Sequence, residues 1–141
     1  MKRIFCFVVI MLAITYVNAQ NKYTYQEVLD FKNGMLDSAR KMTKSVPMQV
    51  NEIQTLYAVA VMDNLITYKY EIARWDGNVT MTKEETNQMK SLTALNMLRS
   101  QEYQDMFLEC LKRTKLEFQF MFFSEDRKYI GGFRLGYNDF L

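Results

Sequence analysis

Histidine is absent from the 141 residues of this sequence, while cysteine occurs only twice, proline once and glycine five times. Without histidine there is no Ser-His-Asp or Cys-His nucleophile, no histidine-ligated metal and no imidazole pH switch. Two cysteines alone cannot complete a zinc or iron–sulfur cage. These absences argue against most hydrolytic and metal-dependent mechanisms, and the sequence predicts no catalytic residue, no cofactor and no metal site.

The composition is that of one folded domain. Hydrophobic residues make up 49% of the chain and charged residues 24%, which is typical of globular proteins and unlike disordered ones. A chain of this length is sufficient for a single domain.

The N-terminal segment has the pattern of a secretory signal. Two basic residues precede the mostly apolar run Ile4–Val17, and Val17-Asn18-Ala19 offers a cleavage site. We therefore expect residues 1–19 to be a signal peptide and residues 20–141 a single α+β domain. The expected location is outside the cytoplasm, either periplasmic or extracellular.

A retained membrane anchor is the alternative for this segment. Spanning a bilayer takes about 20 apolar residues, whereas this run is shorter and is interrupted by Thr15 and Tyr16. Cys6 lies too early in the run to be a lipid-acceptor cysteine. We expect no stable membrane insertion after the signal is removed.

Removal of the signal changes the charge balance. The whole chain has 18 Lys and Arg against 16 Asp and Glu, and Lys2 and Arg3 are the charged residues of the signal, so 16 of each sign remain. A nucleic-acid binder needs a basic excess on one face, so no nucleic-acid partner is expected. The cluster Lys112-Arg113-Lys115 is instead typical of a helix C-terminus.

Cys110 would be the one cysteine left after export, so the mature chain cannot form an internal disulfide. Its place in a helical stripe predicts a buried thiol. An intermolecular disulfide is the alternative in an oxidising compartment.

A first helix is predicted to begin at Thr24-Tyr25-Gln26-Glu27, a capping-box pattern in which hydroxyl and carboxylate satisfy free amides of the first turn. Pro47 predicts its end near Lys44 or Ser45. Between them an apolar stripe recurs at helical spacing: Val28, Phe31, Met35, Ala39 and Met42.

Residues 53–62 and 65–74 are predicted to form a β-hairpin, because Asp63-Asn64 suits a two-residue type I′ turn. One apolar face and one mixed face predict a sheet that is covered on a single side. The pairs expected on the apolar face are Tyr57–Tyr70, Val59–Tyr68 and Val61–Ile66, and those on the mixed face are Leu56–Glu71, Ala58–Lys69 and Ala60–Thr67.

A turn at residues 75–78 and a second capping box at residues 82–85 predict another helix. Its expected core stripe is Met89, Leu92, Leu95 and Leu98 or Arg99. From Ser100 a further helical segment is predicted, with Tyr103, Met106 or Phe107, and Cys110 or Leu111 on one face.

Residues 116–137 are predicted to form a second hairpin around Glu125-Asp126. The apolar run 118–123 would aggregate as an open edge, so we expect a strand beside it and a helix over it. The expected pairs are Phe122–Tyr129, Phe120–Gly131, Phe118–Phe133 and Leu116–Leu135, with Glu117–Arg134 on the other face.

The predicted fold class is α+β, in the order α-β-β-α(α)-β-β. Two hairpins joined edge to edge would form an antiparallel sheet of about four strands, and the helices would cover one face to give a two-layer sandwich.

Two patterns resemble catalytic motifs but are better explained as surface features. Ser38 and Lys41 have the spacing of a penicillin-binding serine and lysine, yet they fall in the middle of a predicted helix without the companion motifs. Asp105 and Glu109 lie four residues apart on one helix face, as an acid–base pair could, but charged residues at this spacing usually form a solvent-exposed helix face.

Residues 46–140 resemble small exported bacterial α+β proteins of uncharacterised families. The resemblance lies in Val46-Pro47-Met48-Gln49-Val50-Asn51-Glu52-Ile53 before a strand, in Leu65-Ile66-Thr67-Tyr68-Lys69-Tyr70, in Phe118–Phe122 and in Tyr129-Ile130-Gly131. The signal ending Asn-Ala before Gln is similar to those of Bacteroidetes-type secreted proteins. The resemblance implies an exported α+β domain and transfers no catalytic residue.

We predict a small exported, non-enzymatic protein that acts by protein–protein binding, with an inhibitor or immunity protein as a specific form. The alternatives are a small carboxylate-based hydrolase or ligand-binding protein, and an envelope component that forms homo-oligomers. The expected partner surface combines the mixed hairpin face with a tryptophan loop, because tryptophan often anchors interfaces: Leu56, Ala58, Ala60, Met62, Trp75 and Asp76.

Overall fold

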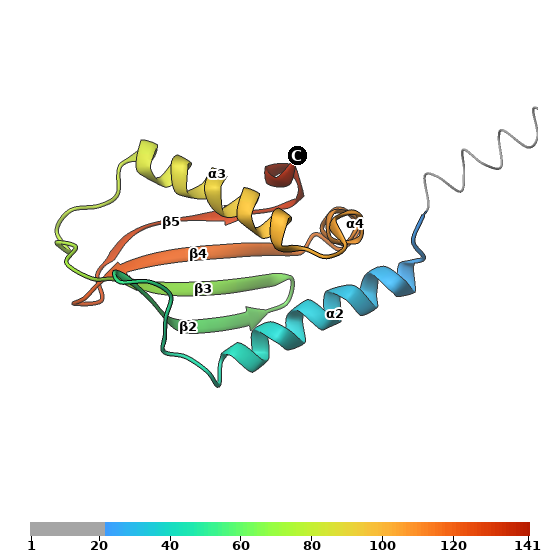
Figure 1. Cartoon of the computed structure of the whole chain (residues 1–141), viewed down its shortest axis with the longest axis horizontal. Helices are drawn as coiled ribbons and strands as arrows, with labels where there is room; N and C mark the ends of the chain where they lie inside the picture. The colour runs from blue at the N-terminus through green and yellow to red at the C-terminus, as the bar shows by residue number, and fades with distance from the viewer. Residues whose placement is uncertain (1–21) are drawn as a thin grey trace, which may run out of the picture.

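The computed structural model describes residues 22–141 (Figure 1). The predicted signal peptide, its cleavage after Ala19 and the place of Cys6 lie outside these residues. The elements in chain order are α2 (Tyr25–Met42), β1 (Met48–Gln49), β2 (Gln54–Met62), β3 (Leu65–Ile72), α3 (Lys83–Ser100), α4 (Gln104–Thr114), β4 (Glu117–Ser124), β5 (Tyr129–Leu135) and the 3₁₀-helix η1 (Tyr137–Phe140). Within this range no helix has the length and apolar character that crossing a membrane requires.

Both capping sites predicted from the sequence begin helices. The hydroxyl of Thr24 accepts from the amide of Glu27 at 3.1 Å, and that of Thr82 accepts from the amide of Glu85 at 3.1 Å. Helix α2 ends at Met42, two residues before the earliest predicted end, in a turn that precedes Pro47.

The strands form one five-stranded sheet in the order β1-β2-β3-β4-β5. The predicted four-stranded antiparallel sheet is therefore wrong in two respects: β1 adds a short strand beside β2, and the two hairpins meet through a parallel pair, β3 and β4. The long connection through α3 and α4 returns the chain to the end of the sheet where β3 began, and this makes β4 run parallel to it.

The first hairpin has the predicted register only near its turn. Ala58 pairs with Lys69 and Met62 with Leu65. Beyond Ala58 a β-bulge at Tyr57 shifts the register, so that Leu56 and not Tyr57 pairs with Tyr70. The extra residue reverses which face each side chain joins from there on.

The second hairpin is offset by two residues from the predicted register. Phe118 pairs with Leu135 and Phe120 with Phe133, because the turn spans residues 125–128 and is not the expected two-residue turn. An offset of two keeps Phe118, Phe120 and Phe122 on their predicted face. A register shift between Phe122 and Phe123 pairs Tyr129 with Phe123, so the predicted place of Tyr129 on the apolar face is wrong, and Ile130 is buried instead. Glu117 and Arg134 still meet at 3.9 Å, as diagonal neighbours.

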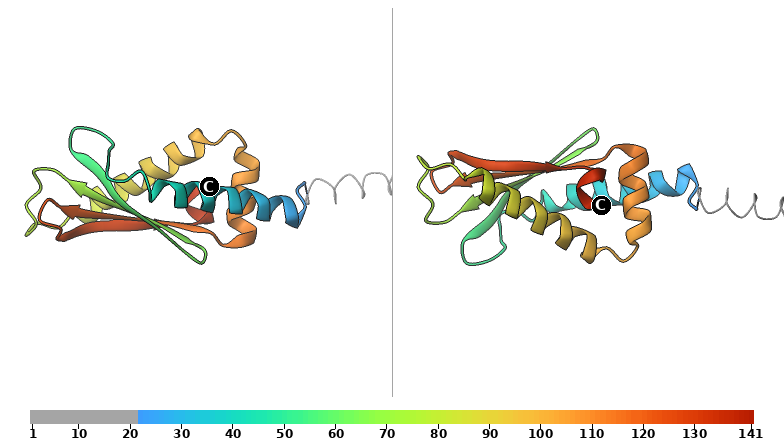
Figure 2. Two further views of the ribbon diagram at one scale, coloured as in Figure 1. Left: turned by 90° about the horizontal axis from the view of Figure 1, so that it is seen from below. Right: turned by 90° about the horizontal axis from the view of Figure 1, so that it is seen from above.

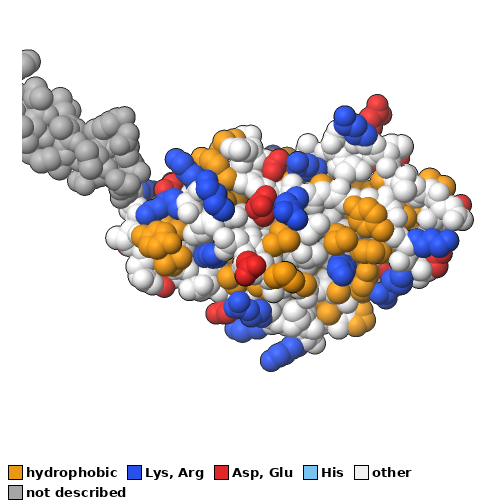
Figure 3. All heavy atoms as spheres, turned by 180° about the vertical axis from the view of Figure 1, so that it is seen from behind, with side chains coloured by type: hydrophobic (Ala, Val, Ile, Leu, Met, Phe, Trp, Pro, Cys, Tyr) orange, Lys and Arg blue, Asp and Glu red, His pale blue; other side chains and the backbone are white. Residues whose placement is uncertain are grey.

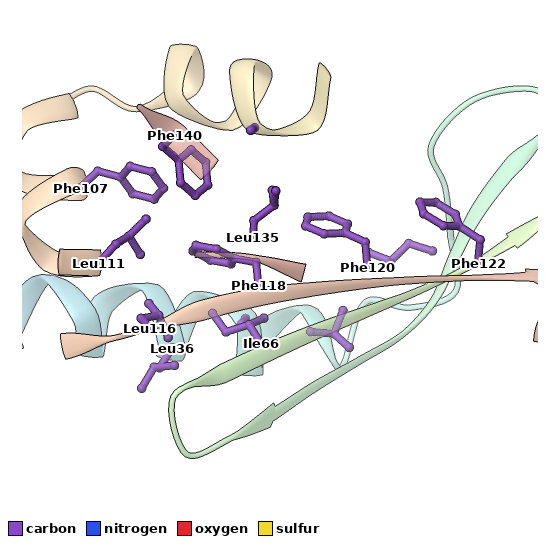
Figure 4. Close-up of a cluster of buried hydrophobic side chains, with 14 of the residues drawn as sticks. Leu36, Ile66, Phe107, Leu111, Leu116, Phe118, Phe120, Phe122, Leu135 and Phe140 are labelled. Carbon is purple, nitrogen blue, oxygen red and sulfur yellow. The ribbon is translucent and has the colours of Figure 1, made fainter. Parts of the chain in front are cut away.

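Within residues 22–141 the helices lie on one face of the sheet and leave the other face open (Figure 2). The core fills the space between the two layers. Figure 4 shows Phe118, Phe120 and Phe122 pointing from β4 toward the helical side, with Phe107 of α4 and Phe140 of η1 packed beyond them. The ring centroids of Phe107 and Phe140 lie 5.2 Å apart in an edge-to-face arrangement.

Candidate functional site

The predicted partner surface on β2 is only partly a surface. Leu56 is 2% exposed and belongs to the core, which corrects its assignment to the outer face. The cause is the bulge at Tyr57, which turns Leu56 inward. Ala58, Ala60 and Met62 do lie on the open face, and Met62 is 72% exposed.

The tryptophan loop is held by its own contacts. The indole Nε1 of Trp75 donates to the carbonyl of Val79 at 2.6 Å, and the ring packs partly buried against the core. A carboxylate oxygen of Asp76 accepts from the amide of Asn78 at 2.9 Å, although Asp76 is exposed. The structure thus gives both residues a role in shaping the loop between β3 and α3.

The two helical carboxylates have separate cationic partners. Asp105 is exposed and contacts the Nζ of Lys22 at 3.3 Å, while Glu109 lies 4.0 Å from Arg113. The structure therefore leaves these two groups as members of surface ion pairs. Ser38 and Lys41 are both exposed on α2.

Cys110 has the buried helical position that its sequence pattern predicts. Its side chain is fully buried on α4, beside the hydroxyl of Thr114. Burial raises the pKa of the thiol, so the reactive thiolate form is disfavoured.

A hollow of about 300 Å³ lies on the helical side of the sheet, between α3 and the segment around β1. Helix α3 supplies one wall, the segment that leads into β2 supplies the other, and aromatic rings of β3 and β4 form the floor. Its lining residues, all uncharged, are Val50, Gln54, Tyr70, Met89, Leu92, Thr93, Asn96, Phe120 and Phe122. We refer to this hollow as the groove.

Apolar side chains along the groove are exposed to solvent. Leu92 of α3 is 59% exposed and Val50 on the opposite wall is 53% exposed, and both line the groove. Leu95 of α3 is outside the lining and is 42% exposed. The sequence placed Leu92 and Leu95 in the core stripe of their helix, and this is wrong: Ala94 is the residue of α3 that is buried, and Leu98 packs beside it. Helix α3 therefore carries apolar residues on the side that packs on the core and also on its exposed side.

Stacked aromatic rings form the floor of the groove. Tyr70 lies 5.6 Å from Phe122 and 6.3 Å from Phe120, both nearly parallel, and Tyr68 stacks on Phe120 at 5.1 Å. Burial raises the pKa of Tyr70, and it raises the pKa of Tyr68 to about 12. Both phenols are therefore neutral hydrogen-bond donors at physiological pH.

A second hollow, of about 390 Å³, lies near η1 but has a different character. Lys115, Glu117 and Asp139 contribute to its lining, and its carboxylates are in ion pairs, Glu117 with Arg134 and Asp139 with Lys90 at 3.1 Å. Both carboxylates of this hollow are therefore paired with cations of the described chain.

The open face of the sheet carries apolar patches between charged side chains (Figure 3). Phe123 packs edge to face against Tyr57 at 5.8 Å and against Tyr129 at 5.7 Å. The guanidinium of Arg127 covers the ring of Tyr57 at 3.7 Å and bonds Glu71 at 2.8 Å. These rings have partners within the chain, unlike the leucines beside the groove.

Sequence reasoning missed the groove because its lining comes from four separate segments. Its one local signal is the apolar pair Leu92 and Leu95 on a helix that already has Ala94 and Leu98 facing the sheet. Helices with apolar residues on opposite sides are usually covered on both, and this excess could have suggested a binding surface.

Comparisons with known proteins identify the fold. No family model and no curated protein matches the chain. Two solved structures are similar: one of "a putative secreted protein" from Pseudomonas aeruginosa, with a TM-score of 0.58 and 10% identity over 84% of this chain and 100% of that one, and one of a pilotin from the Vibrio vulnificus type 2 secretion system, with a TM-score of 0.56 and 8% identity over 84% and 98%. At these identities the likeness is one of fold.

Proposed function

We propose that this chain is a small exported, non-enzymatic protein that binds another protein through the groove between α3 and the sheet. The observation that carries the proposal is the groove itself, an uncharged hollow of about 300 Å³ with the exposed Leu92 and Val50 on its two walls. An exposed apolar surface of this kind costs solubility unless a partner covers it.

The shape of the site favours a helix as the bound segment. Strands β3 and β4 are hydrogen-bonded to each other along their whole length, so the groove floor offers rings and no free strand edge. An extended segment lying there would bury its own backbone amides and carbonyls without partners, which is costly. A helix satisfies its backbone internally and presents only side chains.

Fold likeness supports an accessory role. One similar structure is that of a secreted protein by its description, and the other is that of a pilotin of a type 2 secretion system. By analogy we propose export of this chain, with cleavage after Ala19, and binding to a protein outside the cytoplasm. A narrower form of the same proposal is that this chain is an inhibitor or immunity protein and that the protein it binds is the enzyme whose active site it blocks.

A carboxylate-based hydrolase has less support. Asp105 and Glu109, the acids on which that alternative depends, are each in an ion pair at the surface and do not face the groove.

Site-specific photocrosslinking in the source cell tests the proposal. A photoreactive amino acid is placed at Leu92 beside the groove and, as a matched control, at Met62 on the open sheet face, since both side chains are exposed. We expect one discrete crosslinked protein from position 92 and none from position 62. Adducts only from position 62 would move the binding surface to the sheet, and adducts from neither would refute protein binding. The intact mass of the exported protein gives the cleavage site.

A further inference from the structure

Two tyrosines on the helical face of β3, Tyr68 and Tyr70, have hydroxyls without a hydrogen-bond partner among residues 22–141. Tyr70 lines the groove, and Tyr68 lies two residues before it on the same face of β3. Every fully buried polar side-chain atom in the described chain does have a partner. The two hydroxyls are therefore open to solvent, and water satisfies them while the groove is empty.

Covering the groove removes that water. A bound helix with only leucine along its apolar face would leave the phenolic donor of Tyr70 without an acceptor, and an unmade hydrogen bond of a buried group weakens binding. The rings cannot easily turn away, because Tyr70 is stacked between Phe120 and Phe122 and Tyr68 is stacked on Phe120.

A charged side chain is a poor substitute. The lining of the groove is uncharged, so a carboxylate or an ammonium group would lose its hydration without gaining an opposite charge. The environment already disfavours charge, since burial raises the pKa of Tyr70, which lines the groove. Asn96 and Thr93 on the opposite wall add further uncharged polar groups.

We propose that Tyr70 makes the groove selective for a helix that carries one uncharged hydrogen-bonding side chain, such as Gln or Asn, in the middle of its apolar face. This inference rests on the proposed function, because it names the chemistry of the partner at the same groove. It assigns Tyr70 as a specificity-determining residue whose hydroxyl acts separately from its ring.

Four synthetic peptides serve as probes. Each is an amphipathic helix of 18 residues with the same leucine face, and the central position of that face is Gln, Leu, Glu or Lys. Affinities are measured for the wild-type protein, for Tyr70→Phe and for Tyr57→Phe. Both substitutions remove one hydroxyl and keep the ring, but Tyr57 lies on the open face, so it is the matched control. Leu92→Glu blocks the groove.

We expect the wild type to bind the Gln peptide about tenfold more tightly than the Leu peptide, the ratio given by one hydrogen bond of ordinary strength. The Glu and Lys peptides should bind more weakly than the Gln peptide. The ratio of Gln to Leu affinity should fall to about one in Tyr70→Phe and stay near ten in Tyr57→Phe. Thermal unfolding confirms that each variant is folded.

The failures are distinguishable. Peptides that bind the wild type and lose affinity for Leu92→Glu, but show no preference for Gln or a preference that Tyr70→Phe leaves unchanged, would overturn the inference and leave the groove as a binding site. A preference for Glu over Gln would also overturn it. If Leu92→Glu binds every peptide as well as the wild type does, the groove is not the site and the proposed function fails as well.

Discussion

Replacing Leu56 with alanine tests which face of β2 belongs to the core. The register expected from a two-residue turn places this side chain on the outer surface, whereas the bulge at Tyr57 buries it to 2% exposure. Met62 on the same strand is 72% exposed and provides the matched control, as Met62→Ala.

The expected magnitude follows from the burial of Leu56. Truncation to alanine removes three carbon atoms, worth about 0.8 kcal/mol each when fully buried, and leaves a cavity that adds to the loss. Leu56 lies on the second strand from the sheet edge, beside the short strand β1. The neighbouring chain can relax in part, so we expect a loss of about 3 kcal/mol in the free energy of unfolding. Met62→Ala should change it by less than about 0.5 kcal/mol.

Equilibrium urea unfolding of residues 20–141, followed by tyrosine and tryptophan fluorescence, measures both values. With a slope of about 2 kcal/mol per molar urea, the Leu56→Ala midpoint should fall by about 1.5 M while the slope stays unchanged. A loss below about 1 kcal/mol, or an equal loss for Met62→Ala, would contradict the bulge and restore the register expected from the sequence.

Three further predictions concern single sites. Gly132→Ala should destabilise the fold, because a Cβ there would lie 2.4 Å from the carbonyl of Phe120, whereas Gly34→Ala should stabilise it by about 0.5–1 kcal/mol, since the position is open and helical; thermal unfolding compares the two. The thiol of Cys110 should react with a disulfide reagent only at the rate of unfolding, and fast labelling of native protein would contradict its burial. Folding raises the pKa of Tyr68 from 10.0 to about 12, so the unfolded chain loses this proton at a lower pH than the folded chain does. The free energy of unfolding should therefore fall as the pH rises from 10 toward 12, and Tyr68→Phe should flatten that decline.

Local patterns predicted the helix starts well. The hydroxyl of Thr24 or Thr82 and the amide three residues later are neighbours in the chain, so the contact that begins each helix is independent of the remaining fold. The burial of Cys110 was predictable for the same reason, because the periodicity of its helix was strong.

Strand pairing was predictable only near the turns. Ala58 and Lys69 pair as expected because few residues separate them from Asp63, whose positive φ of 51° supports a tight turn. No sequence pattern indicated the bulge at Tyr57, so the face of Leu56 was assigned wrongly. The longer turn after Ser124 shifted the second hairpin by two residues and left Phe118, Phe120 and Phe122 on their predicted face, but a register shift at Phe123 moved Tyr129 to the other face.

The candidate groove depends on contacts between distant segments. Phe120 and Phe122 were expected on an apolar face, but which helix would cover them depends on how α3 lies across the sheet. In the structure Leu92 and Leu95 remain outside the core while Tyr70 and Phe122 remain beside an open hollow. Apolar side chains of a helix stay exposed where the neighbouring elements do not cover them, and the sequence of the helix alone does not show which side chains these are.

The sequence by itself determined the α+β class, the positions of the helices and the two hairpins, and the absence of histidine chemistry, because these follow from composition and from contacts between residues close in the chain. Tertiary structure alone decided that β3 and β4 run parallel, that Leu56 faces inward and that a groove lies beside α3. The physical reason is that each of these depends on where a long connection returns the chain, and that place is decided by packing between the layers.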